Sequence, residues 1–76
     1  MLNIIEIQPT VGKSLIAAVV SEKHNGAIHS ALTEYVRDTY GEFTSIAYLD
    51  QFAVPVVLVN RKIDLFINAD DLINIL

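Results

Sequence analysis

SALTEYVRDTY (residues 30–40) carries the clearest helical pattern of this sequence. Apolar residues at i, i+3, i+4 and i+8 form one stripe that would face a core, and these are Leu32, Tyr35, Val36 and Tyr40. We expect Ser30 to cap this helix, Glu34 to lie near its positive end, and Gly41 to follow its last turn. The sequence therefore predicts one central amphipathic helix.

The residues before this helix contain one clear strand and one ambiguous segment. Residues 2–8 are rich in isoleucine and predict a strand that ends at Pro9, because proline cannot donate to a sheet ladder. Residues 14–23 (SLIAAVVSEK) fit a helix that stops at Asn25-Gly26. They also fit a strand that pairs with residues 2–8, with Asn25-Gly26 as a hairpin turn into residues 27–30. The valines favour the strand, and both alternatives stay open.

Three further strands and a second helix are predicted after the central helix. The strands cover residues 43–49, 54–59 and 62–67, with Pro55 near the start of the second and a short turn at Asn60-Arg61. The last two would form a hairpin from Val54 to Ile67. Asn68 followed by Asp70 and Asp71 is typical of a capped helix start, so a short helix should end the chain.

These elements predict an α+β fold in a single domain over residues 1–76. It would contain a small mixed or antiparallel sheet of about four to five strands, one central amphipathic helix and a short C-terminal helix. The residues expected in the core are Ile5, Ile7, Leu32, Tyr35, Val36, Val57, Val59, Ile63 and Leu65.

Composition excludes several classes of protein. Apolar residues make up 53% of the 76 residues and charged residues 18%, which is the opposite of a disordered chain. Nine acids face five scattered bases, for a net charge of −4, so the chain lacks the basic patch of a nucleic-acid binder. Nucleic acid is therefore an unlikely partner, and weak binding through Lys13, Lys23, Arg61 and Lys62 remains the third functional alternative.

The absence of cysteine removes disulfides, thiolate metal sites and a cysteine nucleophile, and it favours a reducing compartment. The first residues carry no basic region, and Glu6 interrupts their apolar run, so we expect no signal peptide. The apolar stretch of residues 15–20 is too short to cross a bilayer. These features predict a soluble cytoplasmic protein with no membrane contact.

Three features resemble functional sites, and each has a simpler interpretation. Gly12-Lys13-Ser14 ends like a phosphate-binding loop but lacks the glycine five residues earlier, which predicts an ordinary turn. The two histidines, His24 and His29, are five residues apart and predict surface positions beside a turn. The acids Asp64, Asp70 and Asp71 lack the spacing of a calcium loop and are explained by a solvated strand face and helix capping. No catalytic residue, metal or cofactor is predicted.

The surplus of apolar residues predicts an interaction surface, because a domain this small cannot bury all of them. Candidate contact residues lie beside turns or on weaker strand faces: Tyr48, Phe52, Arg61, Lys62, Phe66, Leu72 and Leu76. The preferred hypothesis is a non-catalytic protein-interaction module, regulatory or inhibitory, that binds a partner protein and forms a homodimer. Such small accessory proteins are common in bacteria and phages. The second hypothesis is an enzyme subunit whose site, shared across a dimer, uses His24 or His29.

Overall fold

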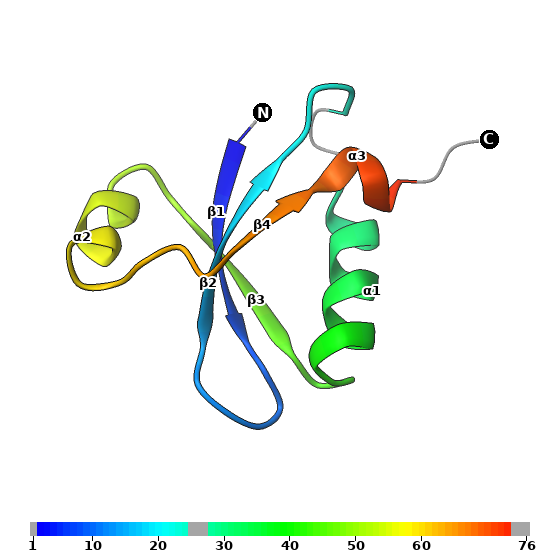
Figure 1. The fold of residues 1–76 in the computed structure, drawn as a ribbon, viewed down its shortest axis with the longest axis horizontal. Coiled ribbons are helices and arrows are strands. Elements are labelled where there is room, and N and C mark those ends of the chain that lie inside the picture. Colours follow the sequence, from blue (N-terminus) through cyan, green and yellow to red (C-terminus); the bar gives the residue numbers. More distant parts are fainter. Residues whose placement is uncertain (1, 25–27, 74–76) are drawn as a thin grey trace.

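The computed structural model describes residues 2–24 and 28–73 and has an α+β fold, as predicted. Within these residues, four strands form one mixed sheet. The elements follow in the order β1 (Leu2–Gln8), β2 (Leu15–Val20), α1 (His29–Tyr40), β3 (Ser45–Leu49), α2 (Ala53–Asn60), β4 (Leu65–Asn68) and α3 (Ala69–Leu72). Helices α1 and α3 lie on one side of the sheet and α2 lies on the other (Figure 1).

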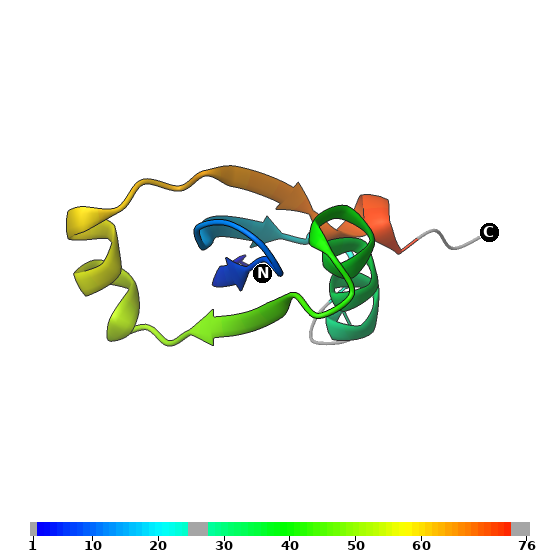
Figure 2. The ribbon, with the colours of Figure 1, turned by 90° about the horizontal axis from the view of Figure 1, so that it is seen from below.

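The strands lie in the order β3-β1-β2-β4. β1 is antiparallel to both of its neighbours, whereas β4 is parallel to β2, so β2, β3 and β4 point the same way. Helix α1 connects β2 to β3 across one face, and α2 connects β3 back to β4 across the other face (Figure 2). Because both the direction of travel and the face are reversed, the two crossovers have the same hand, as parallel connections require.

Each face of the sheet carries its own core. One core joins Ile5, Ile7, Ala17 and Val19 of the sheet to α1 and α3. The other joins Ile4, Ile16 and Ala18 to half-buried residues of α2 and of the segment that follows it. A strand covered on both faces is apolar at every position. This explains the continuous apolar run of residues 15–20, and it confirms the strand alternative for that segment.

The central helix agrees with its prediction except at its N-terminal end, where the first turn contains no acidic residue and Glu34 lies in the second turn. Leu32 and Val36 are buried, and Tyr35 and Tyr40 pack against the same core. Gly41 follows the last turn with φ 122°, and its N–H donates to Arg37 O. The predicted cap at Ser30 is wrong, because the helix begins at His29 and Ser30 already lies inside the first turn.

The hairpin turn proposed at Asn25-Gly26 falls on residues 25–27, which lie outside the described residues. The strand predicted over residues 27–30 is wrong at residues 28–30, which the structure describes. Ile28 is buried in the α1 core, and the chain is helical from His29 onward. In the described residues, α1 is therefore the next element after β2.

The strand predicted over residues 54–59 is the main error, because this segment forms α2. Asp50 Oδ1 accepts hydrogen bonds from the backbone N–H groups of Phe52 at 2.9 Å and Ala53 at 2.8 Å, which caps the helix start. Pro55 lies in the first turn, where the missing N–H would have no partner inside the helix. The predicted hairpin from Val54 to Ile67 therefore does not exist, and Val59, expected in the core, is exposed.

The remaining elements are shorter than predicted. β3 begins at Ser45 and β4 at Leu65, and β4 forms an edge of the sheet. The C-terminal helix is confirmed, with Asn68 Oδ1 accepting from Asp70 N at 3.0 Å, while residues 74–76 lie outside the described residues. Ile5, Ile7, Leu32 and Val36 are buried as expected, whereas Tyr35, Val57, Ile63 and Leu65 are half-buried.

Candidate functional site

Helix α2 is apolar on the side that faces the sheet and also on the side that faces solvent. Val54, Val57 and Leu58, at i, i+3 and i+4, pack on the sheet. Phe52, Val56 and Val59, at i, i+4 and i+7, are 78%, 69% and 80% exposed. We call these three residues, together with exposed Pro55, the outer α2 stripe. A helix that is apolar all round is typical of one that is covered on both sides.

A groove adjoins this stripe at the start of α2. It has a volume of about 570 Å³ and lies between the beginning of β1, the end of β3 and the first turn of α2. We call it the β1–α2 groove, and it is lined by Leu2, Asn3, Ile4, Leu49, Asp50, Gln51, Val54 and Pro55. Pro55 belongs to both features, so the groove and the stripe form one continuous surface. Leu2 is 63% exposed there, which adds to the apolar area open to solvent.

Polar contacts hold α2 against the sheet at its far end. The Arg61 guanidinium donates to Glu6 Oε2 at 3.0 Å, to Ser14 Oγ at 2.8 Å and to the Ser14 carbonyl at 2.6 Å. The Ser14 hydroxyl in turn donates to Glu6 Oε2 at 2.9 Å. Arg61, a predicted contact residue, therefore fixes the segment after α2 to the β1–β2 hairpin. Ser14 contributes to this contact through its hydroxyl and its carbonyl oxygen.

The segment after α2 is also tied to the sheet by Asp64. Its carboxylate accepts from Ile16 N at 2.7 Å, and its own N–H donates to Ile16 O at 2.7 Å. This pair of bonds continues the β2–β4 ladder by one step, with a side-chain oxygen in place of a carbonyl. Asp64 is therefore exposed, as the sequence predicted, but it also has a structural role that the sequence did not predict.

The other predicted contact residues are spread over the surface. Phe66 is 75% exposed on the α2 side of β4, beside Ala18 in the register, and Lys62 is exposed between α2 and β4. Tyr48 lies on β3 toward α1, and Leu72 is half-buried against the α1 core. Leu76 lies outside the described residues. Among these residues, Phe52 alone belongs to the outer α2 stripe.

Sequence reasoning missed Pro55, Val56 and Val59, because it assigned residues 54–59 to a strand. The spacing of Phe52, Val56 and Val59 was a signal for an outward helical face. Asp50, three residues before Ala53, was the matching signal for a helix start.

Asp70 is the centre of a second polar cluster. Its carboxylate accepts from Ser21 Oγ at 2.6 Å and from Glu22 N at 2.9 Å, and it lies 3.0 Å from His24 Nδ1. The Ser21 hydroxyl, followed by His24 and the backbone N–H groups, holds the pKa of Asp70 well below its usual range. Asp70 therefore joins α3 to the segment after β2, which is more than the helix capping predicted for it.

This cluster does not have the geometry of a nucleophilic site. Ser21 and His24 Nδ1 both contact Asp70 Oδ1, and the Ser21 hydroxyl donates to that carboxylate rather than to a base. His24 N also donates to Ser21 Oγ at 2.9 Å. His24 thus helps to hold the segment after β2 against α3.

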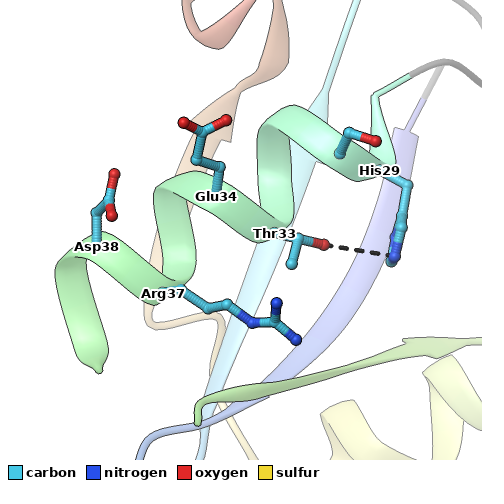
Figure 3. A pocket seen from close by; sticks show the side chains of 6 residues that line it. His29, Thr33, Glu34, Arg37 and Asp38 are labelled. Atoms are coloured by element: carbon cyan, nitrogen blue, oxygen red, sulfur yellow. Dashed lines mark hydrogen bonds between the residues drawn. The ribbon is translucent and has the colours of Figure 1, made fainter. Parts of the chain in front are cut away.

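His29 has separate partners on the α1 side of the sheet. Its Nδ1 lies 2.8 Å from the Tyr48 hydroxyl, and its Nε2 lies 3.4 Å from Thr33 Oγ1. Burial raises the pKa of Tyr48, so its phenol keeps its proton at neutral pH. Side chains along the outer surface of α1 border a pocket of about 510 Å³ here (Figure 3). Within the described ranges, no group of three histidine or acidic side chains is placed to hold a metal ion.

Comparison of the chain with protein-family models, curated proteins and solved structures finds no match. None of the helices in the described residues combines the length and apolarity needed to cross a membrane.

Proposed function

We propose that this protein is a non-catalytic interaction module, regulatory or inhibitory, that binds another protein through the outer α2 stripe and the β1–α2 groove. The observation that carries the proposal is that the solvent-facing side of α2 is apolar, in addition to the side that packs on the sheet. No charged residue interrupts the chain from Gln51 to Asn60. Charge depletion with exposed aromatic residues is the composition found at the centre of protein interfaces.

The area of this surface fits a small interface. Typical side-chain areas give the outer α2 stripe on the order of 400 Å² of exposed apolar surface, and a stable interface needs about 800 Å² per partner. The groove beside Pro55 supplies further area for a partner side chain. A partner with an apolar helix or loop that projects into the groove would cover both.

A second copy of the chain is the partner that the charge pattern favours. If two α2 helices pack antiparallel around a two-fold axis at Val56, Asp50 of one copy lies opposite Lys62 of the other, because both are six residues from Val56. Both side chains are exposed, and both flank the uncharged stripe. Opposite charges at the rim of a two-fold interface favour that register. The proposed homodimer therefore uses α2, in place of the hairpin expected from the sequence.

Sedimentation velocity of Val56→Asp tests this surface. Val11 provides a matched control, because it is 86% exposed in the β1–β2 turn, away from α2. The unaltered protein and Val11→Asp should dimerise at about 100 µM, whereas Val56→Asp should stay monomeric because an interface centre excludes an unpaired charge. Circular dichroism of both variants checks that the fold is retained.

Capture from the source cell tests the wider proposal of a partner protein. Tagged protein and Val11→Asp should retain the same partner, and Val56→Asp should lose it. If Val56→Asp dimerises and retains the partner as the unaltered protein does, the outer α2 stripe is not the binding surface.

A cytoplasmic setting is part of the proposal and is supported by the absence of cysteine.

A further inference from the structure

We propose that a cleft between α1 and β3 binds a small oxyanion, a carboxylate or phosphate group of a soluble ligand. The cleft has a volume of about 240 Å³, which suits a single such group rather than a drug-sized molecule. We call it the α1–β3 cleft, and it is lined by His29, Thr33, Arg37, Thr44, Ser45 and Ile46. It lies on the side of the sheet opposite to α2, so it is independent of the proposed protein interface (Figure 1).

The spacing of α1 separates hydrogen-bond donors from carboxylates. His29, Thr33 and Arg37 occur at i, i+4 and i+8 and share one face of the helix. Figure 3 shows these three side chains on one side of α1, while Glu34 and Asp38 point to the other side. The lining of the cleft therefore contains these donors and no carboxylate, while Glu34 and Asp38 line the neighbouring pocket on α1.

Arg37 is the main donor of this wall. In the described residues its guanidinium has no hydrogen bond or ion pair, unlike that of Arg61, which three acceptors engage. A guanidinium presents a planar fork of N–H groups that matches the oxygens of a carboxylate or phosphate. An exposed side chain beside a polar cleft is thus free to provide two hydrogen bonds to such a ligand.

Thr33 Oγ1 and the Tyr48 hydroxyl both lie within hydrogen-bond distance of the His29 ring. In the tautomer with its proton on Nε2, the Tyr48 hydroxyl donates to Nδ1 and the Nε2–H group faces Thr33 Oγ1 at 3.4 Å. Thr33 Oγ1 accepts in this arrangement, so its own proton is available to an oxygen in the cleft. Tyr48 and His29 therefore act as positioning residues for a second donor.

Thr44 is the most buried residue of the cleft lining. It lines the cleft and is only 3% exposed, and its Oγ1 has no hydrogen-bond partner within the described residues. This oxygen is buried near Gly41 and Thr10, so the donors open to the cleft are those of Arg37 and Thr33. The adjacent Ser45 is exposed and adds another hydroxyl at the same rim.

Titration of isotope-labelled protein with inorganic phosphate, followed by NMR, tests this inference. Sodium chloride is adjusted so that the ionic strength stays constant, and sodium acetate provides a parallel titration. We expect saturable shifts of the backbone amides of Thr33 and Ser45 and of the His29 ring, with a dissociation constant on the order of 1–10 mM. A tighter constant for phosphate assigns the cleft to phosphate groups, and a tighter constant for acetate assigns it to carboxylates.

Two matched variants make the result specific. Arg37→Gln removes the charge of the cleft and should weaken binding at least tenfold. Lys13→Gln removes the same charge from an exposed position in the β1–β2 turn and should leave binding unchanged. The Arg37 side chain is exposed and makes no hydrogen bond or ion pair within the described residues, so Arg37→Gln should remain folded. The NMR spectrum of the variant verifies this. Linear shifts without saturation, equal binding by Arg37→Gln, or an equal loss in Lys13→Gln would each overturn the inference.

Discussion

Replacing Val57 and Val59 by alanine, one at a time, distinguishes a helix from a strand over residues 54–59. In a strand the two side chains share a face, so both substitutions would have similar effects. In α2, Val57 packs on the sheet, whereas Val59 is 80% exposed. The two substitutions should therefore differ in size and in sign.

The expected difference follows from burial and helix propensity. Val→Ala removes two carbon groups, worth about 1.6 kcal/mol at full burial, and alanine gains about 0.5 kcal/mol as the better helix former. Val57 is only partly buried, so Val57→Ala should destabilise the fold by roughly 0.5–1 kcal/mol after this gain. At Val59 little burial is lost, so Val59→Ala should be neutral or stabilising by a few tenths of a kcal/mol.

Urea denaturation of the monomer measures both values. With a urea m-value near 1 kcal/mol per molar, Val57→Ala should lower the midpoint by about 0.5–1 M, and Val59→Ala should leave it unchanged or raise it by up to about 0.3 M. The measurements are made at a few micromolar protein, so that association through α2 does not contribute. Equal destabilisation by both substitutions would refute the helix and restore the strand.

Three further predictions concern stability. Leu32→Ala in the fully buried face of α1 should cost roughly 2–4 kcal/mol in urea denaturation, and a loss below half a kilocalorie would contradict its position. Because the folded pKa of Asp70 is depressed, its contribution should be complete above the ordinary carboxyl pKa of about 3.9 and should be lost as the pH falls toward the folded pKa. Asp70→Asn should flatten the stability profile in that range, and an unchanged acid profile would contradict the role of the cluster. Gly41→Ala should lower the melting temperature more than Gly12→Ala. Both residues have positive φ, but only at Gly41 would the new Cβ collide with Thr10. An equal drop in melting temperature for both variants would contradict this prediction.

The elements that sequence reasoning predicted well are those whose local pattern has one solution. In α1 the apolar spacing, the terminal Gly41 and the surrounding polar residues all agree, and burial in the structure follows that spacing. Residues 15–20 were ambiguous because a run that is apolar at every position has no period. Cover on both faces, which only the whole fold provides, resolves this segment as a strand.

The segment VPVVLV (residues 54–59) shows the limit of composition. Valine favours strands, and a run of apolar residues fits periods of 2 and 3.6 equally well. What selects the helix is a capping aspartate outside the run and three side chains that reach the second sheet face. The outer stripe could be found only after this assignment, since the same residues in a strand would not share one exposed side.

The polar sites depended on contacts distant in sequence. Asp70 bonds Ser21, 49 positions away, and His29 meets Tyr48, 19 positions away. Residue type and spacing identified both histidines but could not supply these partners, because they arise from β2 lying beside β4 and from α1 packing on β3. The donors of the α1–β3 cleft likewise come together only through the crossover.

The parallel pairing of β4 with β2 also affects how the chain folds. β1 and β2 are joined by residues 9–14, whereas residues 21–64 separate β2 from β4. Closing the longer loop costs about 2 kcal/mol more in chain entropy, which must be met before any β4 contact forms. We therefore expect the β1–β2 hairpin to form early and β4 to join the sheet later. The two bonds between Asp64 and Ile16 mark the point where this last strand is brought into register.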